Sequence, residues 1–102
     1  MARTFVRVEL VERTPELDAR FSVAMTERGF VRTIKGRTTH QALSLPDGMY
    51  LVSRKTPVEA LELAREASRE ANVEARIFCV AAGNGVRFGN LAVVDSAPAS
   101  PA

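Results

Sequence analysis

Apolar and charged residues alternate near the start of the chain. One side of this extended segment carries Val6, Val8 and Leu10, and the other carries Phe5, Arg7, Glu9 and Val11. This period of two predicts a β-strand over residues 4–12 with one covered and one partly solvated face. Further strand-like segments are separated by turns. They cover residues 30–34, 41–45, 49–52 and 76–82, with an additional strand at 91–94. The segment 76–82 is the most apolar, so we expect it inside the sheet or under a helix.

Two segments have the three- and four-residue spacing of helices, and each begins with Thr-Pro. Thr14 and Thr56 suit the N-cap because the hydroxyl accepts a hydrogen bond from a free backbone N–H, and proline presets the helical φ at the next position. Glu59 completes a capping box with Thr56. Gly29 and Asn72 are suited to end the helices. The predicted helices cover residues 15–28 and 57–71.

The order strand–helix–strand–strand–helix–strand is the split βαβ arrangement. It predicts a ferredoxin-like βαββαβ sandwich of the α+β class, an antiparallel sheet with both helices on one face and an extra C-terminal strand. Residues 1–95 are predicted to form a single domain. Residues 96–102 contain only Ser, Ala and Pro, so we expect them to be disordered.

The apolar stripes of the helices predict which residues meet the sheet. In the first helix the stripe contains Leu17, Phe21 and Met25. In the second helix it contains small residues and branched ones, with Ala60 at its flank. Its predicted members are Val58, Leu61, Ala64, Ala67 and Ala71. Together with Val6, Val8, Leu10 and Ile77 these stripes are expected to form one core.

Composition adds few constraints to this fold. The chain has 102 residues, 46% of them apolar, and a net charge of +2, which does not by itself imply nucleic acid. No apolar run approaches the ~20 residues of a membrane helix, and no signal peptide begins the chain, so we expect a cytoplasmic protein without a membrane role. The single cysteine, Cys79, is interpreted as a buried, inert thiol. Without a Cys/His cluster, we predict neither a metal nor a cofactor.

The notable polar residues surround the loop predicted between residues 35 and 40. Phosphate-binding, dinucleotide-binding and serine-nucleophile motifs are absent from the sequence. Arginine supplies 12 of the 14 basic residues, and its planar fork pairs with phosphate. The predicted RNA-contacting residues are Arg28, Arg32, Lys35 and Arg37, with Arg54 and Lys55 nearby. His40, the one histidine, is the candidate catalytic residue because imidazole transfers protons near neutral pH, and Tyr50 or Asp47 could assist it. The alternative is a loop histidine beside solubilising charges.

Aromatic residues offer a second possible contact with nucleic acid. Ferredoxin-like RNA-binding domains stack bases on aromatic side chains of the open sheet face. Phe5 and Phe78 could form such a pair if both lie on that face. Core or dimer packing is the alternative for these rings, and the sequence lacks the RNP signature of those domains.

Several segments together resemble the GhoS-like family, the antitoxins of type V toxin–antitoxin systems. The similar segments are residues 5–10, 28–34, 45–50 and 56–61, and the resemblance covers roughly residues 3–94. It implies a ferredoxin-like fold and an endoribonuclease that cleaves the messenger RNA of a membrane-active toxin. It also implies a role for basic residues on the first helix, which here are Arg20 and Arg28.

Three functions remain open at this point. The first is an RNA-directed regulator that binds single-stranded RNA and acts as a metal-independent endoribonuclease. The second is a non-catalytic module that binds a protein partner, such as a toxin or a phage protein. The third is a regulatory dimer that senses a small molecule. Because a four-stranded sheet leaves two edges and one face uncovered, we also expect a homodimer.

Overall fold

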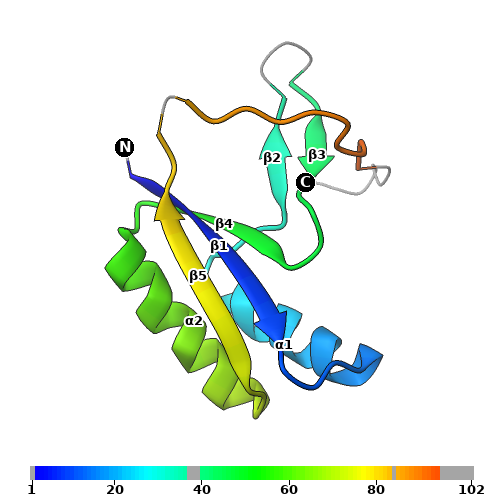
Figure 1. The fold of residues 1–102 in the computed structure, drawn as a ribbon, viewed down its shortest axis with the longest axis vertical. Helices are drawn as coiled ribbons and strands as arrows, with labels where there is room; N and C mark the ends of the chain where they lie inside the picture. The colour runs from blue at the N-terminus through cyan, green and yellow to red at the C-terminus, as the bar shows by residue number, and fades with distance from the viewer. Residues whose placement is uncertain (1, 37–39, 84, 95–102) are drawn as a thin grey trace.

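The computed structural model describes residues 2–36, 40–83 and 85–94, and its elements follow the order β1–α1–β2–β3–β4–α2–β5 (Figure 1). The helices are α1 (Pro15–Glu27) and α2 (Pro57–Ala71). The strands are β1 (Arg3–Leu10), β2 (Thr33–Lys35), β3 (Ala42–Ser44), β4 (Met49–Ser53) and β5 (Ala75–Ala81). The predicted disordered tail, residues 96–102, lies outside the described residues.

The main sheet has three antiparallel strands in the order β4-β1-β5, with β1 in the centre. Alternate residues of β1, among them Val6 and Val8, are buried against both helices in one core that also contains Phe21 and Met25. Both helices therefore cover the same face of the sheet. This arrangement confirms the predicted ferredoxin-like α+β fold.

The predicted caps begin both helices. The Thr14 hydroxyl accepts a hydrogen bond from the Leu17 amide at 3.2 Å. At the start of α2 the box is reciprocal: the Glu59 amide donates to the Thr56 hydroxyl at 3.2 Å, and the Thr56 amide donates to the Glu59 carboxylate at 2.9 Å. Asn72 ends α2 in the left-handed conformation, with φ of 56°. These local hydrogen bonds explain why the helix boundaries follow the sequence pattern.

The buried stripe of α2 differs from the predicted one. Ala60, Ala64 and Ala67 are fully buried, whereas Val58 is 79% exposed. Val58 precedes Ala60 by two residues, which is about 200° around the helix, so the two cannot share a face. The prediction that Val58 is a core residue and Ala60 a flanking one was wrong. The fully buried residues of α2 are all alanines, and the half-buried Leu63 packs beside them. Leu61, also predicted in the core, is only half-buried and lies outside this cluster.

The central hairpin forms a second, smaller layer. β2 and β3 pair with each other in a separate two-stranded sheet, and Val31 joins the main sheet only through a bridge to Leu51. The predicted strand 91–94 is reduced to a bridge between Val93 and Leu43, supported by a hydrogen bond from the Ser44 amide to the Ala92 carbonyl at 2.8 Å. This layer covers Phe5 in a second apolar cluster with Ile34 and Leu51.

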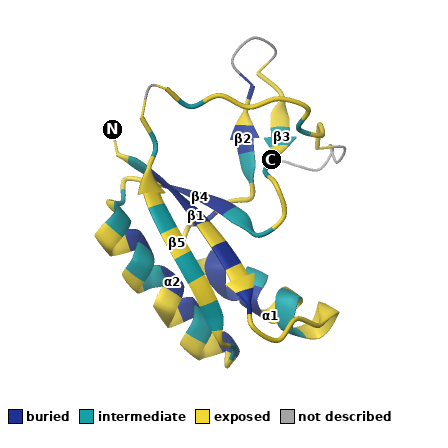
Figure 2. Cartoon of the chain, in the orientation of Figure 1, coloured by how far each residue is buried: buried dark blue, intermediate teal, exposed yellow. Residues whose placement is uncertain are grey.

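β5 lies at an edge of the main sheet rather than in its interior. Figure 2 shows its residues alternating between half-buried and exposed. Ile77 and Cys79 pack against the core on the helix side, which matches the expectation of a strand under a helix. On the opposite face Phe78 is 67% exposed. Cys79 is only partly buried, and its burial raises the pKa of the thiol.

Candidate functional site

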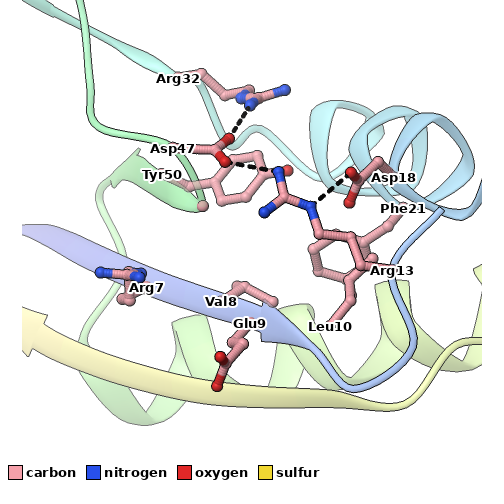
Figure 3. Close-up of a pocket in the computed structure, with 11 residues that line it drawn as sticks. Arg7, Val8, Glu9, Leu10, Arg13, Asp18, Phe21, Arg32, Asp47 and Tyr50 are labelled. Atoms are coloured by element: carbon pink, nitrogen blue, oxygen red, sulfur yellow. Dashed lines mark hydrogen bonds and ion pairs between the residues drawn. The ribbon is translucent and has the colours of Figure 1, made fainter. Parts of the chain in front are cut away.

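A polar cavity of about 470 Å³ lies beside the turn formed by residues 46–48, and we call it the turn pocket (Figure 3). The pocket exists because β4 begins at Met49, opposite Arg7, so β1 continues beyond the end of its neighbour. Gly48 closes the turn with φ of +80°, and its carbonyl accepts a hydrogen bond from the Val8 amide at 2.7 Å. A Cβ at this glycine would lie 2.6 Å from the Val8 carbonyl oxygen, so the turn requires glycine.

Arg13 bridges two carboxylates at the mouth of the turn pocket. Its Nε lies 2.9 Å from Asp18 Oδ2, and its second guanidinium nitrogen lies 2.6 Å from Asp47 Oδ2 (Figure 3). The hydrogen bond from Arg13 lowers the pKa of Asp47, and the two carboxylates together raise the pKa of Arg13. The guanidinium is thus occupied on two sides, and it holds the 46–48 turn against the start of α1.

Arg32 is held more loosely on the same turn. One guanidinium nitrogen lies 3.6 Å from Asp47 Oδ1, and the guanidinium carbon lies 5.5 Å from the centre of the Tyr50 ring. Tyr50 itself is buried between Phe21 and Phe30 in edge-to-face contacts, and this burial raises the pKa of its hydroxyl. Arg32 therefore lies over a buried aromatic ring while about half of its side chain remains exposed.

Arg7 connects the turn pocket to the face of the sheet opposite the helices. It lines both the turn pocket and a shallow depression with Arg76 and Phe78. Arg7 and Phe78 are direct cross-strand partners, so their side chains share this face. Arg76 lies 3.4 Å from Glu9, its own cross-strand partner. We call Arg7, Arg76, Phe78 and Val80 the open-face strip.

The structure disperses the cluster predicted around the hairpin. Arg28 turns toward α2, where it lies 2.7 Å from Glu70 and 3.6 Å from Glu66 and donates to the Ala24 carbonyl. These carboxylates, the Glu70 hydrogen bond first, raise the pKa of Arg28.

The remaining predicted residues are separated from Arg28. Arg32 belongs to the turn pocket. Lys35 and His40 are exposed at the outer end of the β2–β3 hairpin, and Arg37 lies outside the described residues. Arg20, implied by the family resemblance, donates to the Ala71 carbonyl at the end of α2.

The predicted pair of exposed phenylalanines is not formed. Phe5 is 7% exposed because the small sheet and the segment after β5 cover it, so only Phe78 is available on the open face. Sequence reasoning placed Arg7 on this face through strand alternation but did not select it as a site residue. Arg13 was also missed, since nothing in the sequence links it to Asp47, 34 positions away.

A scan against protein-family models and a search of curated proteins both find no match. In the described part of the chain, His, Cys, Asp and Glu side chains do not gather in groups of three or more that could hold a metal ion. Neither described helix is long and apolar enough to cross a membrane.

Proposed function

We propose that the protein is an RNA-directed regulator that binds single-stranded RNA along the open-face strip. The single observation that carries this proposal is the exposure of Phe78 on the sheet face, directly across from Arg7. A solvent-exposed aromatic ring on a ferredoxin-like sheet can stack an unpaired base, and an adjacent guanidinium can pair with the phosphate of the same nucleotide. The resemblance to type V antitoxins supports the same class of ligand.

Charge pairing determines which arginines are available for phosphate. Arg7 has no ion pair with any described residue, and Arg32 is only loosely paired with Asp47. Arg13 and Arg28 are each engaged by two carboxylates, so binding phosphate would require breaking those contacts. RNA is therefore proposed to run from Phe78 past Arg7 toward Arg32.

Cleavage of the bound RNA is proposed as a separate, metal-independent step. His40 is the one histidine of the chain and is exposed at the outer end of the β2–β3 hairpin. The proposed RNA path would continue from Arg32 along β2 to this end of the hairpin. His40 would accept the proton of the 2′-hydroxyl as that oxygen bonds to the adjacent phosphorus. The bond from phosphorus to the 5′-oxygen then breaks, the 5′-oxygen takes a proton from solvent, and a 2′,3′-cyclic phosphate is left. Incubation of labelled RNA in EDTA tests this step: product should form with the wild type and not with His40→Ala.

Fluorescence anisotropy with a labelled single-stranded RNA tests binding. Phe78→Ala should weaken binding about 5- to 150-fold, because base stacking on an aromatic ring contributes about 1–3 kcal/mol. Arg7→Ala should also weaken it. Val58→Ala and Arg65→Ala are matched controls on exposed positions of α2 and should bind as the wild type does.

Two outcomes of this assay would contradict the proposal. Unchanged binding by Phe78→Ala would remove the open-face strip as the RNA site. Absence of binding by the wild type at low salt would instead favour the protein-interaction module, with Phe78 and Val80 as its contact surface.

A further inference from the structure

The outer edge of β5 is an unpaired strand edge. The Ala82 amide donates to the Arg3 carbonyl, and the Glu74 carbonyl accepts from the Val11 amide, so the even-numbered residues direct their backbone groups toward β1. The odd-numbered residues from Ala75 to Ala81 consequently direct their N–H and C=O groups away from the sheet. Within the described chain, no strand pairs with this side of β5.

The residues of β5 also lack the side chains that usually protect strand edges. Natural edges carry lysine, proline, glycine bulges or a covering segment. β5 has seven residues without lysine, proline or glycine, and its one charged residue, Arg76, is paired with Glu9. The other edges are partly covered, since Val31 bonds to Leu51 on β4 and residues 92–94 bond to β3.

We propose that β5 pairs with β5 of a second copy of this chain, in antiparallel orientation, about a two-fold axis at Phe78. The strand runs from Ala75 to Ala81, so Phe78 is its central residue. Only this register pairs the whole strand, with Ala75 opposite Ala81 of the partner subunit. Every outward N–H and C=O then gains a partner, and the two three-stranded sheets become one sheet of six strands.

The side chains are compatible with this register. On the open face Phe78 lies opposite Phe78 of the partner subunit, and Arg76 lies opposite Val80 of the partner subunit, so no like charges face each other. A register shifted to centre on Arg76 would oppose two guanidinium groups, which is unfavourable. Pairing places Phe78 and Val80, which are 67% and 48% exposed, next to side chains of the partner subunit, while the open face of the joined sheet stays accessible.

The dimer also completes the RNA site, a consequence that rests on the proposed function. In the β5–β5 pairing, Phe78 and Phe78 of the partner subunit form a non-hydrogen-bonded pair. The Cα atoms of such a pair are about 4.5 Å apart. Two rings side by side, flanked by an Arg7 from each subunit, form a platform for more than one base. One RNA strand should therefore bind per dimer.

Sedimentation equilibrium without RNA tests whether two copies pair. Two substitutions of opposite charge at Val80 test the register of the pairing. Val80→Glu places a carboxylate opposite Arg76 of the partner subunit, whereas Val80→Arg places a second guanidinium there. Both substitutions remove the same apolar side chain, so the difference between them reports the cross-subunit contact. We expect the wild type to dimerise at micromolar concentration and Val80→Arg to dimerise about tenfold more weakly than Val80→Glu.

A disulfide provides a second test of the register. Ile77 lies opposite Cys79 of the partner subunit in a hydrogen-bonded pair, with Cα atoms about 5.5 Å apart, which is within the range of a disulfide. Oxidised Ile77→Cys should therefore form a covalent dimer. Circular dichroism before oxidation checks that this variant is folded.

The possible failures can be told apart. A wild type that stays monomeric at micromolar concentration and yet binds RNA would overturn only the dimer. A dimer that does not bind RNA would leave the β5 pairing in place and overturn the proposed function. Equal dimerisation by Val80→Glu and Val80→Arg would overturn the register.

Discussion

Phe21 is the large side chain of α1 that fills the space between the helix and the sheet. It is 3% exposed and meets the Tyr50 ring edge to face at a centroid distance of 6.1 Å. Phe21→Ala should lower the free energy of unfolding by ~3–5 kcal/mol, because it removes buried apolar surface and leaves a cavity. Urea denaturation measures the loss. Val23→Ala, on the exposed side of the same helix, should change stability by less than ~0.5 kcal/mol. A loss below about 1 kcal/mol for Phe21→Ala would contradict its burial.

Asp47 makes stability depend on pH through its contact with Arg13. Arg13 holds the pKa of Asp47 in the folded protein below its pKa in the unfolded chain. The contact therefore stabilises the fold fully above the unfolded-state pKa, and this stabilisation is lost as the pH falls through the folded-state pKa. Denaturation between about pH 5 and about pH 3 should therefore show decreasing stability. Asp47→Asn should show a smaller decrease than the wild type. Because the pair is exposed, the difference will be small, and an identical pH dependence would contradict the contact.

At the scale of residues, the sequence predicted side-chain direction better than side-chain partners. Strand alternation correctly placed Val6 in the core and Arg7 on the other face. It could not reveal that Arg28 is bound by two glutamates of α2, because that contact depends on how the helices pack. For the same reason the Arg13–Asp47 pair at the turn pocket was beyond local sequence reasoning.

At the scale of elements, the capping box of α2 is the clearest local determinant. Removing the hydroxyl in Thr56→Ala leaves the Glu59 amide without its acceptor and should cost ~1 kcal/mol of stability. Thr26→Ala, at an exposed helical position of α1, is the matched control and should be neutral or slightly stabilising, since alanine is the better helix former. Thermal denaturation followed by circular dichroism compares the two. Equal effects would show that the cap contributes nothing beyond helix propensity.

Both helices were predictable because their caps and apolar spacing lie within a few residues of each other. The strands of the small sheet were less predictable from the sequence. β2 and β3 have only three residues each, and their pairing depends on the segments packed beside them. The turn at Gly48 separates β3 from β4 and carries the chain back to β1, where its carbonyl bonds to Val8. That long-range bond, rather than local propensity, divides the hairpin from the main sheet.

At the scale of the whole molecule, the small sheet and the segment after β5 determine what the open face can bind. They bury Phe5 and leave Phe78, Arg7 and Arg76 accessible. The net charge of +2 gives no strong general attraction to nucleic acid, so affinity should come from a few contacts. The number of those contacts can be measured through the salt dependence of binding.

RNA that contacts both the open-face strip and Arg32 should make about two to three phosphate contacts. The plot of log K for binding against log salt concentration should then have a slope of about −1.4 to −2. Arg7→Ala should reduce that slope by about 0.7 for each Arg7 that contacts the RNA, because each lost phosphate contact also removes a released counterion. Phe78→Ala should weaken binding without changing the slope, since stacking releases no counterions. Anisotropy titrations over a series of salt concentrations measure both values, with Arg65→Ala as the charge control. A slope that Arg7→Ala leaves unchanged would show that Arg7 does not contact phosphate, even if the affinity falls.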